Sequence, residues 1–216
     1  MTEFKVCCIA DADELELAVR VGASAIGLVG PMPSGPGPIP LERIRALAPL
    51  APPAVQSFFL TSRTDASGVL EEHDVASTTT IQLVDHVPAD ELRTLRRARP
   101  SVRLVQVIHV RHDASVAEAL AAAPLVDALL LDSGNPAAAI KELGGTGRVH
   151  DWTVSAHICA QSPVPVYLAG GLNAANVGAA IAAVRPHAVD VCSGVRTNGR
   201  LDAAKLHAFA VAVRGA

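Results

Sequence analysis

Thiols and carboxylates set in apolar runs are the residues of this chain best suited to chemistry. Cys7 and Cys8 lie side by side in FKVCCIA (4–10), Asp132 ends the run ALLLD, and Asp190 interrupts AVDVCS. Apolar neighbours should raise the pKa of Asp132, which suits a general acid, although capping the following loop is the alternative. A charge within a strand needs a partner, so Asp190 either contacts a substrate or belongs to a buried polar network.

The four cysteines, at positions 7, 8, 159 and 192, form no CxxC motif. This argues against a zinc knuckle or a thioredoxin-type site and agrees with a reducing compartment. Neighbouring residues of a strand point to opposite faces, so a disulfide between Cys7 and Cys8 would strain the backbone. The pair is therefore either core packing or a reactive thiol with its neighbour.

Three glycine-bearing stretches lie in the last third of the chain: GGTG (144–147), AGGLN (169–173) and SGV (193–195). Glycine lets backbone N–H groups approach a ligand, and a following helix N-terminus favours an anion. Three such stretches favour a phosphate site, whereas the alternative is that they only form tight turns. The eight histidines show no HxH or HExxH spacing, so a metal site is poorly supported, and we expect most of them to be solvated.

Strand-like runs alternate with helical stretches along the whole chain and would position these residues. The expected strands are 4–10, 24–30, 54–60, 80–84, 102–110, 126–132, 164–169 and 188–193. The expected helices are 13–22, 40–48, 89–99, 114–123, 151–161, 174–184 and 202–213. Several strands are apolar throughout, as in a buried parallel sheet, and their number predicts a single (β/α)8 TIM barrel, with a doubly wound open sheet as the alternative.

The expected barrel forms one domain over residues 1–216, because no linker, repeat or low-complexity tract divides the chain. Its third unit is the weakest, since no clear helix follows residues 54–60. Asp11 or Asp13 should begin the first helix and Asn173 the seventh. Active sites of such barrels lie at the carboxyl ends of the strands, which would gather the thiols, the carboxylates and the glycine loops into one ring.

Composition narrows the classes of partner. Half of the 216 residues are apolar, 18% are charged and the net charge is −3, so a large core is available and nothing favours nucleic acid or an anionic membrane. No apolar run approaches the length of a membrane span, and the N-terminus has no basic-then-apolar leader. We therefore expect a cytoplasmic protein.

Several of these stretches together resemble the phosphoribosylanthranilate isomerase family of tryptophan biosynthesis. They are FKVCCIADADELELAVRVGASAIGLV, LLLDSGN, GGTGRVHDW, VYLAGGLNAANVGAAIAAVRPHAVDVCSGV and DAAKLHAFAVAVR. The resemblance spans nearly the whole chain and is weaker between residues 30 and 115. It implies a (β/α)8 barrel that rearranges an N-(5-phosphoribosyl)arylamine into a 1-deoxyribulose aminoketose, an Amadori rearrangement that requires no cofactor.

The resemblance also implies roles for individual residues. Cys7 falls on the cysteine of the K-(I/V)-C-G-I-T motif, the general base, and Asp132 falls on the aspartate of L-L-L-D-S/T, the general acid. Asp190 matches an aspartate near the sugar. The implied phosphate-binding residues are Gly145, Gly147, Gly170, Gly171, Ser193 and Gly194. Strand alternation would then direct Cys7 into the barrel and Cys8 outward, towards the helices, as a small core residue.

The chain departs from the family pattern at the mouth of the expected barrel. Cys8 replaces the glycine of the motif, and Gly37 stands where an arginine binds the anthranilate carboxylate. Losing an arginine–carboxylate pair should weaken binding by on the order of a few kcal/mol unless another cation replaces it. Arg63, Arg111, Arg148 and Arg196 are the candidates, and Arg196 stands where the family has a glutamate after SGV.

Two hypotheses follow. The first is an isomerase acting on N-(5-phosphoribosyl)anthranilate or a close phosphoribosyl-amine analogue, with Arg196 among its substrate contacts. The second is an idle barrel that binds a sugar phosphate for regulation or scaffolding, suggested by the missing arginine. Retention of Cys7 and Asp132 favours the isomerase. We expect a monomer or homodimer that binds a small molecule, without nucleic acid or membrane.

Overall fold

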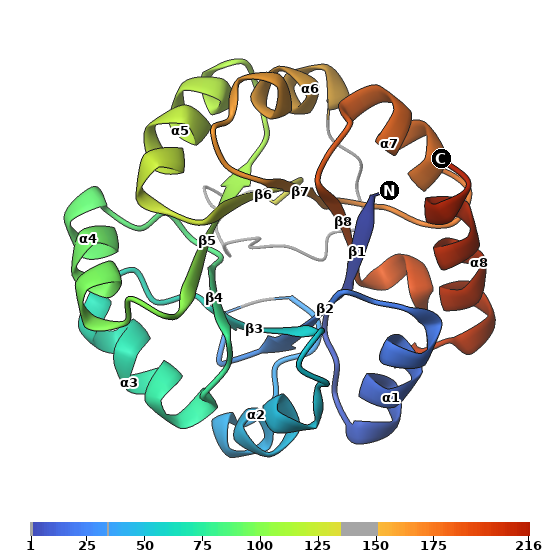
Figure 1. Cartoon of the computed structure of the whole chain (residues 1–216), viewed down its shortest axis with the longest axis horizontal. Coiled ribbons are helices and arrows are strands. Elements are labelled where there is room, and N and C mark those ends of the chain that lie inside the picture. The colour runs from blue at the N-terminus through green and yellow to red at the C-terminus, as the bar shows by residue number, and fades with distance from the viewer. Residues whose placement is uncertain (1, 34, 135–150) are drawn as a thin grey trace.

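Eight parallel strands close into a barrel in the computed structural model, which describes residues 2–33, 35–134 and 151–216 (Figure 1). The strands are β1 (Glu3–Val6), β2 (Ala25–Val29), β3 (Gln56–Thr61), β4 (Thr80–Leu83), β5 (Arg103–His109), β6 (Ala128–Asp132), β7 (Val166–Leu168) and β8 (Ala188–Val191). Each pairs with its sequence neighbours, and β1 pairs with β8. The closed order confirms the (β/α)8 barrel and excludes the open sheet.

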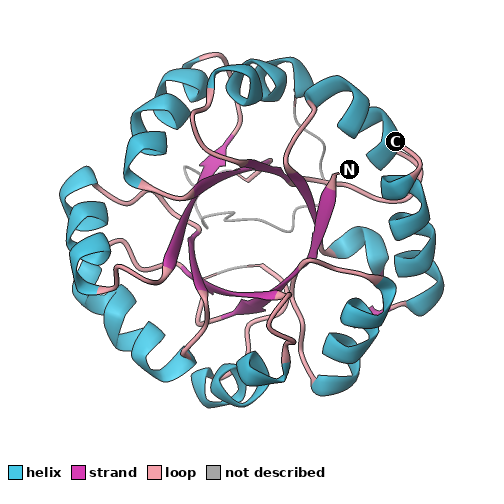
Figure 2. Ribbon diagram, viewed as in Figure 1, coloured by secondary structure: helices cyan, strands magenta, loops and turns pink. Residues whose placement is uncertain are grey.

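A helix follows each strand and covers the outside of the barrel (Figure 2). The helices are α1 (Ala12–Val21), α2 (Leu41–Leu47), α3 (Ala66–Ala76), α4 (Ala89–Ala98), α5 (Ala114–Ala122), α6 (Trp152–Gln161), α7 (Val177–Val184) and α8 (Ala203–Arg214). The third unit is therefore complete, contrary to the sequence-based expectation. Asp65 begins α3 by accepting a hydrogen bond from the Gly68 N–H, a capping signal that the weak helical pattern of ASGVLEEHDVA concealed.

Helix starts agree with the sequence in one of the two named cases. Asp11 caps α1, and its carboxylate accepts a hydrogen bond from the Glu14 N–H. The seventh helix begins three residues later than expected, with Asn176 at its N-cap. The Asn173 side chain instead accepts a hydrogen bond from the Ala175 N–H in the turn that precedes the helix. Among the residues described, no helix is long and apolar enough to cross a membrane.

Side chains pack in two separate layers, on either side of the barrel wall. The outer layer joins the strands to the helices and includes Phe4 and Val6 of β1. The inner layer fills the barrel, where Phe58 and Tyr167 meet edge to face with ring centroids 5.7 Å apart. Because side chains alternate along a strand, every second residue points into the barrel. The inner-layer residues nearest the carboxyl ends of the strands therefore line the barrel mouth.

Candidate active site

A buried ion pair joins the first and last strands. Lys5 and Asp190 are register partners across β1 and β8, and Lys5 Nζ donates to Asp190 Oδ2 over 2.9 Å. Asp190 thus belongs to a buried polar network, one of the two alternatives left by the sequence. Its other oxygen, Oδ1, accepts no hydrogen bond from any residue that the structure describes, so this oxygen has capacity for a ligand.

Lys5 lies at the centre of the site, where it interacts with both Cys7 and Asp132. Gly27 makes room for it: a side-chain carbon at Gly27 would lie 2.8 Å from Cys7 Sγ and 3.1 Å from Lys5 Nζ. Burial disfavours the charge on Lys5, but the negative charges of Asp190 and of the Cys7 thiolate outweigh burial and raise the pKa of Lys5. Lys5 therefore remains a cation inside the barrel. No local sequence pattern marks Lys5, because its counter-ion Asp190 lies 185 residues away in the sequence.

Removing one partner of the Lys5–Asp190 pair should destabilise the protein more than removing both partners. Lys5→Met leaves Asp190 buried and uncompensated, so we expect the free energy of unfolding to fall by about 3–5 kcal/mol. The double variant Lys5→Met/Asp190→Leu has no buried charge and should lie closer to the wild type. Urea unfolding followed by circular dichroism measures both. Equal losses in the two variants would contradict a compensated pair.

Cys7 faces the barrel interior, two residues beyond Lys5. It is buried in the inner layer beside Lys5 and Gly27. Contact with the Cys8 thiol lowers its pKa, and the positive charge of Lys5 acts in the same direction, while burial and Asp190 oppose them. The neighbouring thiol and the Lys5 cation thus both favour the thiolate form of Cys7.

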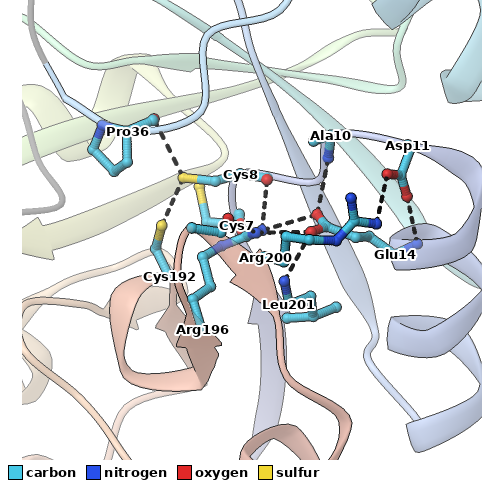
Figure 3. A network of polar contacts seen from close by, with 11 residues as sticks. Cys7, Cys8, Ala10, Asp11, Glu14, Pro36, Cys192, Arg196, Arg200 and Leu201 are labelled. Carbon is cyan, nitrogen blue, oxygen red and sulfur yellow. Dashed lines mark hydrogen bonds and ion pairs between the residues drawn. The ribbon is translucent and has the colours of Figure 1, made fainter.

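Cys8 does not point towards the helices, and this expectation was wrong. It packs in the inner layer and accepts a hydrogen bond from the Cys192 thiol, with the two sulfur atoms 2.7 Å apart (Figure 3). The Cys8 thiol also donates to the Pro36 carbonyl over 3.5 Å. Strand β1 ends at Val6, and Cys8 has a φ of +64°, so the alternation of a strand no longer applies. This left-handed conformation favours glycine, the residue of the family motif at this position.

Asp132 reaches the same interior from β6. It lies two residues beyond Leu130, an inner-layer residue, and is buried at the end of the strand. Burial raises its pKa, against the opposing effects of the Ser133 N–H, which donates to Asp132 Oδ1 over 2.7 Å, and of His109. Asp132 thus has a raised pKa and also accepts a hydrogen bond from the next residue, while its role as a general acid stays a prediction.

The Lys5–Asp190 pair connects the two candidate catalytic groups. Lys5 and Asp190 interact electrostatically with Cys7 and also with Asp132. All four side chains are buried. A thiol with a lowered pKa and a carboxyl with a raised pKa therefore share one charged centre inside the barrel.

The loops after β7 and β8 lie against each other. Gly170 and Gly171 have φ values of +89° and +63°, which side chains disfavour. A side-chain carbon at Gly194 would lie 2.0 Å from the Leu172 carbonyl oxygen, so only glycine allows this approach. Ser193 and Gly194 begin a short 3₁₀ helix, whose first N–H groups have no partner within it. Gly145 and Gly147 lie outside the described residues.

Arg196 is engaged within the protein (Figure 3). Its guanidinium pairs with both carboxylate oxygens of Glu14, at 2.9 and 3.1 Å. It also donates to the carbonyls of Cys7 and Cys8, at 3.2 and 2.6 Å. Its side chain is only 8% exposed. The geometry favours an anchor for the end of β1 over the substrate contact expected from the sequence.

A steric contact explains why glycine stands at position 37, where the family has an arginine. Its φ is +83°, and a side-chain carbon there would lie 2.6 Å from the Cys8 Cβ. Cys8 therefore occupies the space into which a side chain at position 37 would start. Arg63 is already engaged with another residue, because its Nε donates a hydrogen bond to Glu72 over 2.9 Å. It is therefore not a free replacement for the missing arginine. Arg148 lies outside the described residues.

The Gly37 contact predicts opposite effects for two glycine substitutions. Gly37→Ala adds a methyl group against Cys8 in a left-handed conformation, and should lower the free energy of unfolding by about 1–3 kcal/mol. Gly178→Ala is the matched control, because Gly178 lies in α7 with open space around it, and should stabilise by up to about 1 kcal/mol. Thermal unfolding of both variants measures the difference. A neutral Gly37→Ala would mean that the loop relaxes away from Cys8.

Comparisons with known proteins agree with this architecture. The family model described as N-(5'-phosphoribosyl)anthranilate isomerase matches residues 60–212. The chain is 34% identical to the N-(5'-phosphoribosyl)anthranilate isomerase of Methanocella arvoryzae, covering 93% of this chain and 92% of the relative. The chain belongs to this isomerase family. It is also 33% identical to the enzyme of Methanothrix thermoacetophila, with 99% of each chain covered.

A solved member of the family has the same fold. The crystal structure of phosphoribosyl anthranilate isomerase from Thermotoga maritima superposes with a TM-score of 0.86 at 26% identity, covering both chains completely. Family membership makes the chain an isomerase and confirms the resemblance seen in its motifs. The idle sugar-phosphate-binding barrel is not favoured.

Proposed function

We propose that the protein catalyses the Amadori rearrangement of N-(5-phosphoribosyl)anthranilate or a close analogue to the corresponding 1-deoxyribulose 5-phosphate aminoketose. One observation carries this proposal: Cys7, which follows β1, and Asp132, which ends β6, are both buried and both interact with the same Lys5–Asp190 pair. A base and an acid that share one centre can act on two atoms of one sugar.

The candidate acid and base would each carry out one proton transfer. Asp132, protonated, donates to the furanose ring oxygen, and the ring opens to a Schiff base. Cys7, as the thiolate, removes the proton from C2 of the sugar, and the resulting enolamine tautomerises to the ketone. Asp190 is proposed to accept a hydrogen bond from the sugar through Oδ1, which has no partner among the described residues. General acid–base catalysis of this kind contributes about 10²–10⁴-fold for each group.

The two pKa shifts act in the direction that this chemistry requires. The productive form holds a thiolate at Cys7 and a proton on Asp132, whereas an ordinary cysteine is protonated and an ordinary aspartate ionised near neutral pH. A lowered pKa at Cys7 and a raised pKa at Asp132 both increase the population of the productive form.

The phosphate is proposed to bind the loops after β7 and β8. Gly170 and Gly171 have no side chains that would keep a phosphate away from the backbone. The N–H groups of Ser193 and Gly194 lie at the start of a short 3₁₀ helix and would donate to the phosphate. Phosphate sites at this position are frequent in barrels of this type. Gly145 and Gly147 remain candidate contacts from the sequence. We propose that the enzyme acts in the cytoplasm, whose reducing conditions favour the free-thiol form of its four cysteines.

The amine specificity is tested with two substrates. The purified protein is assayed with freshly generated N-(5-phosphoribosyl)anthranilate, whose fluorescence decreases on turnover, and with the aniline analogue that lacks the carboxylate. Turnover of the first supports the family reaction, and turnover of the analogue alone supports a substrate suited to Gly37. Binding of a reduced product analogue without turnover of either substrate would favour the idle barrel. Light scattering of the same sample decides between monomer and homodimer.

A further inference from the structure

Two thiols from opposite ends of the chain meet at the barrel mouth. Cys8 follows β1 and Cys192 follows β8, and their sulfur atoms lie 2.7 Å apart (Figure 3). A disulfide bond is about 2.05 Å long, so an approach of about 0.7 Å would join them. Both cysteines are free. We propose that Cys8 and Cys192 are a reversible disulfide site whose oxidation switches off the isomerase, an effect that rests on the proposed function.

The surroundings of the pair suit thiol–disulfide exchange. The Arg196 guanidinium contacts the Cys8 carbonyl and interacts electrostatically with both sulfurs. Hydrogen bonding with Cys192 and Cys7, together with burial, raises the pKa of Cys8, so Cys8 stays protonated until Cys192 has reacted. Cys192 is half-buried, whereas Cys8 is only 5% exposed, so Cys192 is the sulfur that a reagent reaches first.

The proposed oxidant is a low-molecular-weight disulfide such as oxidised glutathione. Cys192, as the thiolate, attacks one sulfur of the reagent, and the released glutathione thiolate takes up a proton. Cys8 then loses its proton and attacks the Cys192 sulfur, which releases the second glutathione. The balance is two protein thiols oxidised to one disulfide and one external disulfide reduced to two thiols.

Oxidation would act on Cys7 through its neighbour. Cys7 and Cys8 are consecutive residues, and Arg196 donates to the carbonyls of both, at 3.2 and 2.6 Å. Drawing the Cys8 sulfur towards Cys192 by about 0.7 Å would therefore displace the short segment that presents Cys7. We expect at least about a tenfold fall in kcat on oxidation, restored by a dithiol reductant.

The test combines intact mass with activity. The reduced protein is treated with oxidised glutathione, and we expect a loss of about 2 Da without a glutathione adduct, together with the fall in turnover. Cys192→Ser and Cys8→Ser should prevent the mass loss, and Cys192→Ser should prevent the inactivation by oxidant. Cys159→Ser is the matched control, since Cys159 lies in α6 away from the mouth, and it should behave as the wild type.

Three results would overturn the proposal. They are a stable glutathione adduct, an unchanged mass, or a mass loss that persists in Cys192→Ser and so arises from the other thiols. An oxidised protein of unchanged activity would overturn its regulatory part. A failure of the proposed function can be distinguished from a failure of the disulfide proposal. A protein that turns over no substrate when reduced would still lose about 2 Da when oxidised.

Discussion

Cys7→Ser should reduce kcat by about 10²–10⁴-fold while leaving the protein folded. Serine is nearly isosteric with cysteine, but its hydroxyl has no accessible anion near neutral pH, so neither the Lys5 charge nor the Cys8 thiol can generate a base there. The loss should appear in kcat, because proton removal from C2 follows substrate binding. Steady-state fluorescence assays with the phosphoribosyl-amine substrate measure the change.

Two controls separate lost chemistry from lost structure. Cys159→Ser replaces a cysteine of α6 remote from the mouth and should keep wild-type turnover. Cys7→Ser itself should bind the reduced product analogue about as tightly as the wild type. If Cys7→Ser retains more than about a tenth of the activity, Cys7 is not the base, and Cys8, which faces the same interior, becomes the candidate.

Asp132→Asn should cause a loss of similar size, about 10²–10⁴-fold in kcat. Asparagine keeps the shape of the side chain, and its carbonyl oxygen can still accept the hydrogen bond from the Ser133 N–H. It cannot donate an acidic proton to the ring oxygen. The capping interaction is therefore preserved and the acid alone is removed, which distinguishes the two readings of Asp132.

The pH dependence gives an independent check on Asp132. An acid must be protonated to act, so the fraction of Asp132 able to donate falls as the pH rises through its pKa. Because burial raises that pKa, this fall occurs at higher pH than for an ordinary aspartate. The kcat/KM profile of the wild type should be bell-shaped, and residual turnover by Asp132→Asn should lose one limb. An unchanged profile would place the titrating acid elsewhere.

Local patterns were sufficient to predict the strands and the environment of Asp132. Apolar runs marked the eight strands, and the run ALLLD indicated a carboxyl in apolar surroundings, whose pKa is raised. Helix α3 was missed because Gly68 and His73 weaken its propensity and its apolar stripe is poorly defined.

Features that depend on distant contacts or on unusual backbone were not predictable. Lys5 became recognisable only through its register partner Asp190, 185 residues away. Cys8 was assigned to the wrong face because a sequence gives no sign that a cysteine adopts a φ of +64°. Arg196 looked available for a substrate, and only the structure reveals its pairing with Glu14.

The pairing of Lys5 with Asp190 also sets a condition on how the chain folds during synthesis. The first strand leaves the ribosome with its lysine long before the eighth strand exists, so β1 lacks one neighbour and its cation lacks a counter-ion until nearly the whole chain is made. Contacts this distant in sequence form slowly. We expect barrel closure to be a late event, and fragments that end before residue 190 to leave the lysine hydrated and the first strand unpaired on one side.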